Sequence, residues 1–259
     1  MVSEFPWLTV VTVVKDDLSG LKKTIRSLVD QVDLSGVEYL VIDSSVNSAA
    51  AEAAVSDSLI LDARFNWCHP AGIYSAMNIG LSLAHGRYIY FLNAGDILAD
   101  PQVLADLKNS MNNIEPVWVV GRVKISEANG NTVLSQNWDY HAERKAPFAR
   151  GVFPPHQGTV VRTESLREVG GFDSRYSISA DYAAALSLSL LSDPLMTARV
   201  IARFTEGGIS TRNWKESFRQ FHSARRSIFE PKGFNSVREY FNYRKHFASV
   251  WLIRSLRRP

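Results

Sequence analysis

The sequence predicts one α/β domain, built on a mostly parallel, mixed β-sheet with helices on its faces, and a helical tail at the C-terminus. Short apolar runs rich in β-branched residues alternate with segments whose apolar residues recur at helical spacing. Hydrophobic residues make up 46% of the 259 residues and charged residues 21%, as in folded soluble proteins. This length suits a single core, because cores stop growing at about 250–300 residues.

The first half of the chain alternates predicted strands and helices. The predicted elements are a strand at Leu8–Val14, a helix from Leu18 to Leu28, a strand at Tyr39–Ile42, a weak strand at Ser58–Leu61, a helix at Tyr74–Ala84 and a strand at Tyr88–Leu92. Strands separated by helices imply a parallel sheet, whose ligands bind beyond the carboxyl ends of the strands. Asp43 and the segment Asn93–Asp96 both lie at such ends.

The second half continues with less regular alternation. We expect a helix near Pro101–Met111, strands near Val117–Ile125 and Thr132–Gln136, a strand at Gly158–Val161, and helices at Glu164–Val169 and Ala180–Leu191. A long polar stretch from Trp138 to Pro155 interrupts them. Loops of that length inside a compact domain are usually functional or mobile.

The single cysteine and the short apolar runs bear on where the chain works. Cys68 has no partner within the chain, so neither an intrachain disulfide nor a cysteine-based zinc site can form. The first apolar run is broken at Lys15, and nowhere do about 18 apolar residues run together. We therefore expect a cytoplasmic chain. The sequence contains neither a GxGxxG nor a GxxxxGK(S/T) motif, which counts against dinucleotide-dependent dehydrogenases and P-loop enzymes.

The tail differs from the rest of the chain in charge. Residues 212–259 carry 12 Lys and Arg against 3 Glu, whereas residues 1–211 have a net charge of −6. Aromatic residues recur between the basic ones at roughly helical spacing from Trp214 onward, which predicts amphipathic helices. Either these aromatic residues pack on the main domain, or part of the tail rests on an anionic bilayer. In the second case the chain would be peripheral on the inner face of the plasma membrane.

The stretch from Ala71 to Asp96, AGIYSAMNIGLSLAHGRYIYFLNAGD, is the strongest indication of chemistry. A helix, a buried strand and a polar turn ending in an acid would place Asp96 at the edge of the sheet. Mg²⁺ and Mn²⁺ prefer carboxylate and phosphate oxygens, so one Asp and the oxygens of a bound diphosphate can suffice to hold the ion. Taken alone, Asp96 is better explained as a turn or helix-cap residue, and only the surrounding block of motifs favours a metal ligand.

Several blocks together resemble the family 2 glycosyltransferases, which have the GT-A fold and build bacterial polysaccharides and glycolipids. Residues 72–96 resemble that family's GIYDAMNKG-to-FLNSGD block. His156-Gln157, Gly170–Asp173 and Ile178–Tyr182 resemble its HQ…GGFD…ADYD pattern, and Gly207–Thr211 resembles its closing GG(I/V)S segment. The matches follow the family order from residue 8 to about residue 211.

The resemblance implies a role for each matching residue. Asp96 matches the metal ligand for Mg²⁺ or Mn²⁺, and Asp181 matches the general base that deprotonates the acceptor hydroxyl. The expected nucleotide contacts are Val13, Val14, Lys15, Asp43, Gly72, Asn93 and Ala94, and the expected acceptor contacts are His156 and Gln157. His156 is explained equally well as a structural hydrogen-bond donor, and Asp43 equally well as a residue favoured in any turn between a strand and a helix. Gly72 is explained most simply as a backbone position that needs glycine. Tyr74, Met77 and Leu81, at helical spacing, are expected in the core.

The resemblance also implies the overall function and its division along the chain. We expect an inverting transfer of a sugar from a nucleotide-diphosphate sugar, with UDP-sugars favoured over GDP- or dTDP-sugars, to a carbohydrate or lipid-linked hydroxyl. The expected domain spans residues 1–211, with a nucleotide-binding half to residue 96 and an acceptor half from residue 97, followed by the basic tail, residues 212–259. We expect no nucleic-acid partner and make no prediction of oligomeric state.

Four places depart from the family pattern, one of them the acid before the GIY segment, which is replaced around His69-Pro70. Ser75 and Ala183 replace acids, and Ile79 replaces a lysine. These changes leave open an altered donor preference or a loss of activity. A noncatalytic relative that binds ligands in the same cleft is therefore the first alternative, and a basic adaptor for membranes or nucleic acids is the second.

Overall fold

The computed structural model describes residues 5–126, 131–135, 146–205 and 213–230, together with residues 240–241, 243–245 and 247–249. Its first half contains β1 (Leu8–Val14), α1 (Leu18–Val29), β2 (Val37–Asp43), α2 (Ala49–Ser56), β3 (Ala63–Trp67), α3 (Ile73–Leu83), β4 (Tyr88–Phe91), β5 (Ile97–Leu98) and α4 (Val103–Met111). Its second half contains β6 (Trp118–Ser126), β7 (Thr132–Leu134), α6 (Ala146–Ala149), the 3-10 turn η1 (His156–Gly158), β8 (Thr159–Arg162), α7 (Thr163–Glu168), α8 (Ala180–Leu191), β9 (Leu195–Thr205) and α10 (Trp214–Phe229).

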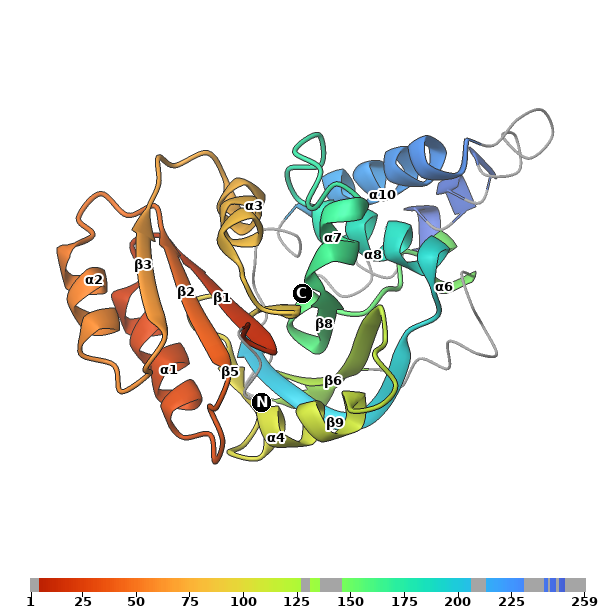
Figure 1. The fold of residues 1–259 in the computed structure, drawn as a ribbon. Helices are drawn as coiled ribbons and strands as arrows, with labels where there is room; N and C mark the ends of the chain where they lie inside the picture. Colours follow the sequence, from red (N-terminus) through yellow and green to blue (C-terminus); the bar gives the residue numbers. More distant parts are fainter. Residues whose placement is uncertain are drawn as a thin grey trace.

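The strands form one mixed sheet in the order β3-β2-β1-β4-β8-β6-β9-β5, with β7 paired to β6. Strands β3, β2, β1 and β4 run parallel. β8 is antiparallel to both β4 and β6, and β9 runs parallel to β6. The sheet curls into a half-barrel with helices around it, which confirms the predicted GT-A-type fold (Figure 1).

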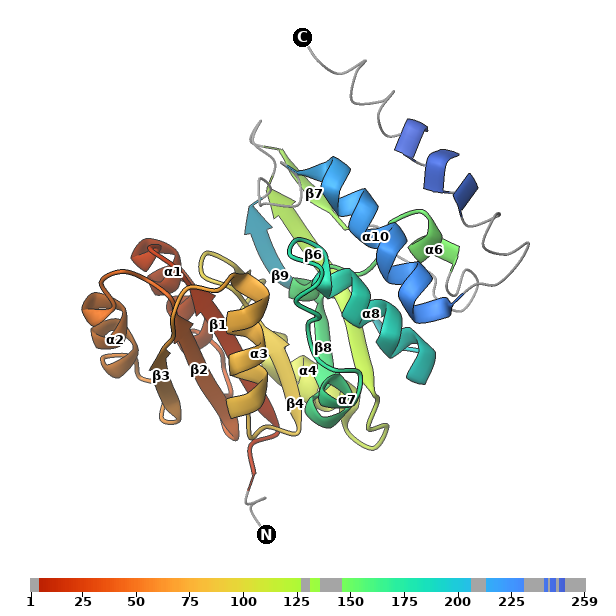
Figure 2. The ribbon, with the colours of Figure 1, turned by 90° about the horizontal axis from the view of Figure 1, so that it is seen from above.

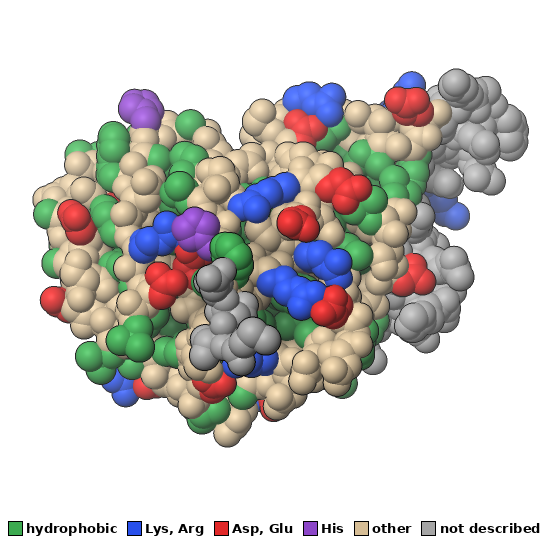
Figure 3. Space-filling view, viewed as in Figure 1, with side chains coloured by type: hydrophobic (Ala, Val, Ile, Leu, Met, Phe, Trp, Pro, Cys, Tyr) green, Lys and Arg blue, Asp and Glu red, His purple; other side chains and the backbone are tan. Residues whose placement is uncertain are grey.

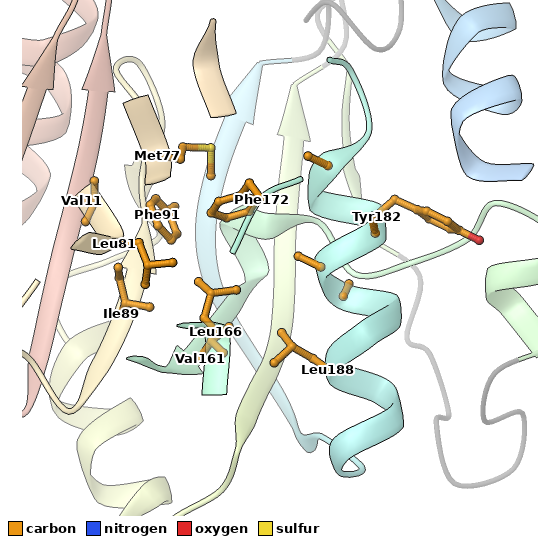
Figure 4. Packing of buried hydrophobic residues seen from close by; sticks show 14 of the residues in the cluster. Val11, Met77, Leu81, Ile89, Phe91, Val161, Leu166, Phe172, Tyr182 and Leu188 are labelled. Carbon is orange, nitrogen blue, oxygen red and sulfur yellow. The ribbon is translucent and has the colours of Figure 1, made fainter. Parts of the chain in front are cut away.

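Each face of the sheet packs against its own set of helices. Along β1, Val11 and Val13 contribute to the core beside α3 and α8, whereas Leu8, Val10 and Val14 contribute to the core beside α1 and α4. Both faces of the sheet at β1 are therefore covered by apolar side chains, as the unbroken apolar run of this strand predicted. Figure 4 shows Phe172 between the side chains of β4 and α3 and the helix α8, and its ring meets that of Phe91 at a centroid distance of 5.0 Å.

One sequence-based expectation is wrong in the first half, and a strand of the second half was not anticipated. Ser58–Leu61 lies in a turn after α2, and the edge strand is β3, five residues with partly exposed side chains. The short run was misassigned because an exposed edge strand lacks the apolar pattern that marks a buried one. The strand β9 was not anticipated, because Arg residues interrupt its apolar pattern.

Parts of three other expectations lie outside the described residues. The closing segment Gly207–Thr211 is one of them, and residues 136–145 of the long polar stretch are another. The rest of that stretch forms α6 and a loop that leads into η1. In the tail, residues 231–239 and 250–259 are not described.

The helix α10 packs against α8, as Figure 2 shows from above. Phe221 is 8% exposed and its ring lies 4.3 Å from that of Tyr182. Arg225 is also buried, and its guanidinium donates hydrogen bonds to the Phe148 carbonyl and the Tyr182 hydroxyl. The first part of the basic tail therefore packs on the α/β core through its aromatic residues, as the first of the two alternatives predicted.

Later tail residues also contact α10. Trp214 and Phe247 have ring centroids 5.4 Å apart, and His222 stacks on Tyr243 at 4.4 Å. Figure 3 shows acidic and basic side chains interspersed over one face of the molecule. Within the described part of the chain, the structure contains no helix with the length and hydrophobicity needed to span a bilayer.

Candidate active site

The turn Asn93–Asp96 follows β4 and is held against α1. The Thr24 hydroxyl donates to the Asp96 carbonyl at 2.7 Å and accepts from the Gly95 amide at 3.1 Å. Gly20 permits this approach, because a Cβ atom there would lie 2.9 Å from the Gly95 nitrogen. Gly95 itself has φ of 92°, a conformation that favours glycine. Thr24 was not anticipated, although a small residue and a hydroxyl four positions apart mark one face of the helix.

The Asp96 carboxyl group is largely enclosed at this edge of the sheet. The residue is 9% exposed, and the Gln157 side-chain amide donates to its Oδ2 at 3.2 Å. Burial raises the pKa of Asp96 from 3.8 to about 6, while the nearby His156 and the Gln157 hydrogen bond oppose that rise. The ionised form of a buried carboxylate that has only one neutral side-chain hydrogen-bond donor is stabilised by a cation placed beside it.

His156 connects the turn to the second candidate acid. The Asn93 amide nitrogen Nδ2 lies 3.1 Å from His156 Nε2. Because an amide nitrogen only donates, Nε2 of a neutral ring must accept, and the ring proton then lies on Nδ1. That atom is 3.7 Å from Asp181 Oδ2. Residues that are far apart in the sequence therefore form one connected group.

Asp181 lies in the first turn of α8. The Tyr74 hydroxyl lies 2.9 Å from Asp181 Oδ1 and also 2.9 Å from the Ile178 carbonyl, and the Tyr182 amide donates to the same Oδ1. Burial and the Asp181 charge raise the pKa of Tyr74 well above its usual range, so Tyr74 remains a donor. Met77 and Leu81 lie in the core as expected, whereas Tyr74 is only partly buried and contacts Asp181.

A cavity lies between the carboxyl end of β1 and the start of α3. Its volume is about 360 Å³, and its described lining residues are Val13, Val14, Lys15, Ser44, Pro70, Gly72, Ile73 and Ala76. Four of the expected nucleotide contacts therefore line one cavity, namely Val13, Val14, Lys15 and Gly72. Ala94 adjoins it, since its amide donates to the Val13 carbonyl at 3.1 Å.

Asp43 lies beside this cavity, next to Ser44, and is fully buried. Its Oδ1 accepts from the Ser45 amide at 2.8 Å and from the Ser45 hydroxyl at 2.5 Å. Its Oδ2 is buried and makes no hydrogen bond within the described part of the structure. A buried acceptor of this kind is costly unless a ligand supplies a donor.

The turn offers oxygen ligands for a divalent cation. Besides the Asp96 carboxylate, the Asn93 Oδ1 atom is buried and forms no hydrogen bond to the described residues. Such hard oxygen donors suit Mg²⁺ or Mn²⁺. Across the described ranges no group of three or more His, Cys, Asp and Glu side chains is arranged around a metal position, so the rest of the coordination sphere would have to come from a ligand or from water.

The sequence profile of glycosyl transferase family 2 matches residues 9–170 of this chain. The match covers more than half of the chain, so the protein belongs to that family and is a glycosyltransferase. This finding confirms the resemblance that the sequence motifs indicated.

Among curated proteins, an uncharacterized glycosyltransferase of Mycobacterium tuberculosis is 26% identical over 222 residues, which cover 80% of this chain and 78% of that protein. A PGL/p-HBAD biosynthesis glycosyltransferase of the same species is 29% identical over 145 residues, 54% of this chain and 53% of the relative. The first of these relatives matches over most of both chains.

Solved structures share the fold at low sequence identity. Residues 1–349 of TarS from S. aureus superpose with a TM-score of 0.67 at 14% identity, covering 93% of this chain and 70% of the other. The mannosyltransferase PcManGT from Pyrobaculum calidifontis, in complex with GDP-Man and Mn²⁺, gives a TM-score of 0.65 at 13% identity, covering 99% and 77%. At this identity the likeness establishes the fold alone.

Proposed function

We propose that this glycosyltransferase moves a sugar from a nucleotide-diphosphate sugar to an acceptor hydroxyl, and that the transfer inverts the anomeric configuration. UDP-sugars are the favoured donors. The observation that carries the proposal is the connection between the two candidate acids. Gln157 bonds to Asp96 and its neighbour His156 faces Asp181, so a metal-binding turn and a base would share one supporting segment. TarS has been solved with UDP and with UDP-GlcNAc, and PcManGT with GDP-Man and Mn²⁺.

The donor nucleotide would occupy the cavity at the end of β1. Val13, Val14, Lys15 and Gly72 line it, and the free Asp43 Oδ2 could accept a hydrogen bond from the base or the ribose. A volume of about 360 Å³ lies within the ~300–1,000 Å³ usual for ligand pockets. The diphosphate would then extend toward Asn93–Asp96, since Ala94 is bonded to Val13.

Asp96, with Asn93 beside it, would hold Mg²⁺ or Mn²⁺. When bound, the ion would neutralise charge on the departing nucleotide diphosphate. Thr24 and Gln157 keep the turn and the carboxylate in place through their hydrogen bonds. A carboxylate kept in position before the donor arrives needs no reorganisation when charge develops.

Asp181 would act as the general base. Its Oδ1 is occupied by Tyr74 and the Tyr182 amide, which leaves Oδ2 to take the proton of the acceptor hydroxyl. The acceptor oxygen would then form a bond to the anomeric carbon from the face opposite the diphosphate, while the bond from that carbon to the diphosphate oxygen breaks. Base assistance of this kind contributes about 10²–10⁴-fold to the rate.

His156 and Gln157 support this arrangement from the acceptor side. Both side chains bond to the Asn93–Asp96 turn, so their positions are set by the donor side of the site. We keep the prediction that this segment also contacts the acceptor. We also keep a carbohydrate or lipid-linked hydroxyl as the expected acceptor.

The departures from the family pattern leave the proposed metal ligand and base in place. On α8, Ala183 is 5% exposed and belongs to the core, whereas Asp181 faces the site, so the lost acid of the ADYD pattern leaves the proposed base in place. Ser75 and Ile79 lie on α3, the helix that begins at the donor cavity. Their changes therefore favour an altered donor preference over a loss of activity.

A nucleotide-sugar screen tests the proposal. We expect UDP-sugars to raise the melting temperature only in the presence of Mn²⁺ or Mg²⁺, because a ligand at 100 times its Kd stabilises the folded state by about 2.7 kcal/mol. The bound donor is then incubated with candidate acceptors, and NMR of the product gives the anomeric configuration. Metal-dependent binding without transfer to any acceptor would favour the noncatalytic alternative, and a retained configuration would refute the inverting mechanism.

A further inference from the structure

A second cavity lies on the other flank of the Asn93–Asp96 turn, between α1 and the ends of β5, β6 and β9. Its volume is about 680 Å³. Figure 1 shows α1 next to β5 and the end of β9. Among the described residues it shares no lining residue with the donor cavity. The donor site therefore does not account for it.

The rim of this cavity is rich in positive charge. It is lined by the exposed side chains Lys22, Lys23, Arg26 and Arg203, and by two acids, Asp30 and Asp100. Both acids are already engaged, since Asp30 pairs with Arg26 at 3.0 Å and Asp100 pairs with Arg199 at 2.5 Å.

The two lysines stand next to each other on α1. Neither forms an ion pair with the described part of the chain. Both line the cavity, and two ammonium groups around one hollow raise the local positive potential, which low-dielectric walls focus further. This arrangement favours a multiply charged anion.

The floor of the cavity has a different character from its rim. Ile97, Leu98 and Phe204, which are buried or partly buried, contribute apolar surface to the lining, together with the exposed Pro101. The Arg203 guanidinium bonds to the Ala99 carbonyl, which holds that cation at the floor's edge. A basic rim above an apolar floor suits a ligand with a phosphate group next to an apolar or planar part.

We propose that this cavity binds a phosphate-bearing compound, either a soluble phosphate or diphosphate ester or the head group of a phospholipid, at a site separate from the donor nucleotide. Gly95 forms part of its wall, and the Gly95 amide is bonded to Thr24. A ligand there would contact the same turn that carries Asp96. The site thus adds a second anion-binding position on the opposite flank of that turn.

Calorimetric titration of inorganic pyrophosphate tests the site, using the full chain in EDTA at low salt. The test variant is Lys22→Ala/Lys23→Ala. A matched control, Lys215→Ala/Lys245→Ala, removes the same charge from the tail, and Lys15→Ala reports on the donor cavity. Because all five lysines are exposed, we expect each variant to fold, which its melting temperature checks.

We expect the wild-type chain to bind pyrophosphate and the Lys22/Lys23 variant to bind about tenfold more weakly, a loss of about 1.4 kcal/mol. Both control variants should bind pyrophosphate with a Kd within about twofold of the wild-type value. No binding to the wild type overturns the proposal. Equal weakening in the test and tail variants, which would indicate nonspecific charge, overturns it too, as does weakening confined to Lys15→Ala.

Vesicles distinguish the two sources of phosphate. Sedimentation with phosphatidylcholine vesicles, with and without phosphatidate, is compared for the same variants. Loss of phosphatidate-dependent binding in the Lys22/Lys23 variant assigns the site to a lipid head group. Unchanged vesicle binding, together with weaker pyrophosphate binding, assigns it to a soluble phosphate compound. UDP-GlcNAc binding with Mn²⁺ is measured separately in that variant, so a failure of the proposed donor site is seen independently of this cavity.

Discussion

Replacing Asp96 with Asn should stabilise the metal-free protein at neutral pH while abolishing the metal-dependent gain from a nucleotide sugar. Asp96 is 9% exposed, and burial raises its pKa from 3.8 to about 6. The folded state therefore holds a proton on this group that the unfolded chain has already released between those two pH values. Stability must fall as pH rises through this window, and the full penalty is present above about pH 6.

The size of the expected change in stability follows from the same pKa shift. A rise from 3.8 to about 6 corresponds to about 3 kcal/mol against folding at pH 7.5. The Asn side chain carries no charge, and its Oδ1 can still accept from Gln157. The amide group of Asn also has to be desolvated on folding, so the expected net gain in the free energy of unfolding is about 1–3 kcal/mol. Each kcal/mol corresponds to a rise of about 2–4 °C in melting temperature. The part of the gain that comes from ionisation should shrink to about half at pH 5 and to about a fifth at pH 4, while the cost of desolvating the amide does not change with pH.

Urea unfolding in EDTA at pH 7.5, 5 and 4 measures this gain. Asp62→Asn is the matched control, since it removes one carboxylate from an exposed position and should change stability little at each pH. A variant that is less stable than the wild type at pH 7.5, or equally stabilised at all three values, would refute the reasoning. With Mn²⁺ and a bound UDP-sugar, only the wild type should gain further stability, which would identify a functional carboxylate held at a cost to folding.

The remaining predictions concern the base, its support, the close approach of α1 and the tail. Asp181→Asn should keep donor affinity and lower kcat by about 10²-fold or more, and a wild-type rate would mean that another base acts. Tyr74→Phe should lower kcat and shift its pH profile with little change in donor KM, because it removes only the hydroxyl bonded to Asp181; an unchanged profile would show a purely structural role. Gly20→Ala should destabilise the protein in urea, although Ala usually favours helices by about 1 kcal/mol, because the new Cβ would lie 2.9 Å from the Gly95 nitrogen; a stabilised variant would contradict that close approach. Removing residues 231–259 should reduce sedimentation with anionic vesicles at low salt if the tail binds membranes, with α10 retained as the control for folding; equal binding by both forms would exclude that role.

Much of the candidate site was predictable because each of its parts has a local cause. The turn Asn93–Asp96 had to fall at a strand's carboxyl end once Tyr88–Leu92 was assigned as a buried strand. Asp181 had to lie at the start of a helix for the same kind of reason. The interpretation of Tyr74 was incomplete, because helical spacing places a residue on a face without showing where its hydroxyl ends.

The errors also have physical causes. The strand β3 has partly exposed side chains and alternates poorly, so a neighbouring apolar run was taken for the edge strand. In β9, Arg199 and Arg203 interrupt the apolar alternation. Edge and half-exposed strands are stabilised by their ladder partners, which a local pattern does not contain.

The sequence by itself determined the fold class, the family and the positions of the two candidate acids, because periodicity and turn chemistry act over a few residues. Only the tertiary structure decided that these acids share one supporting segment. Antiparallel insertion of β8 between β4 and β6 brings η1 to the end of β4, where the Tyr90 hydroxyl donates to the Gln157 carbonyl at 2.8 Å. The basic cavity beside α1 has the same origin, since it forms where the curled sheet returns β9 to the first helix. Strand order depends on packing over the whole domain, and no local window of sequence contains it.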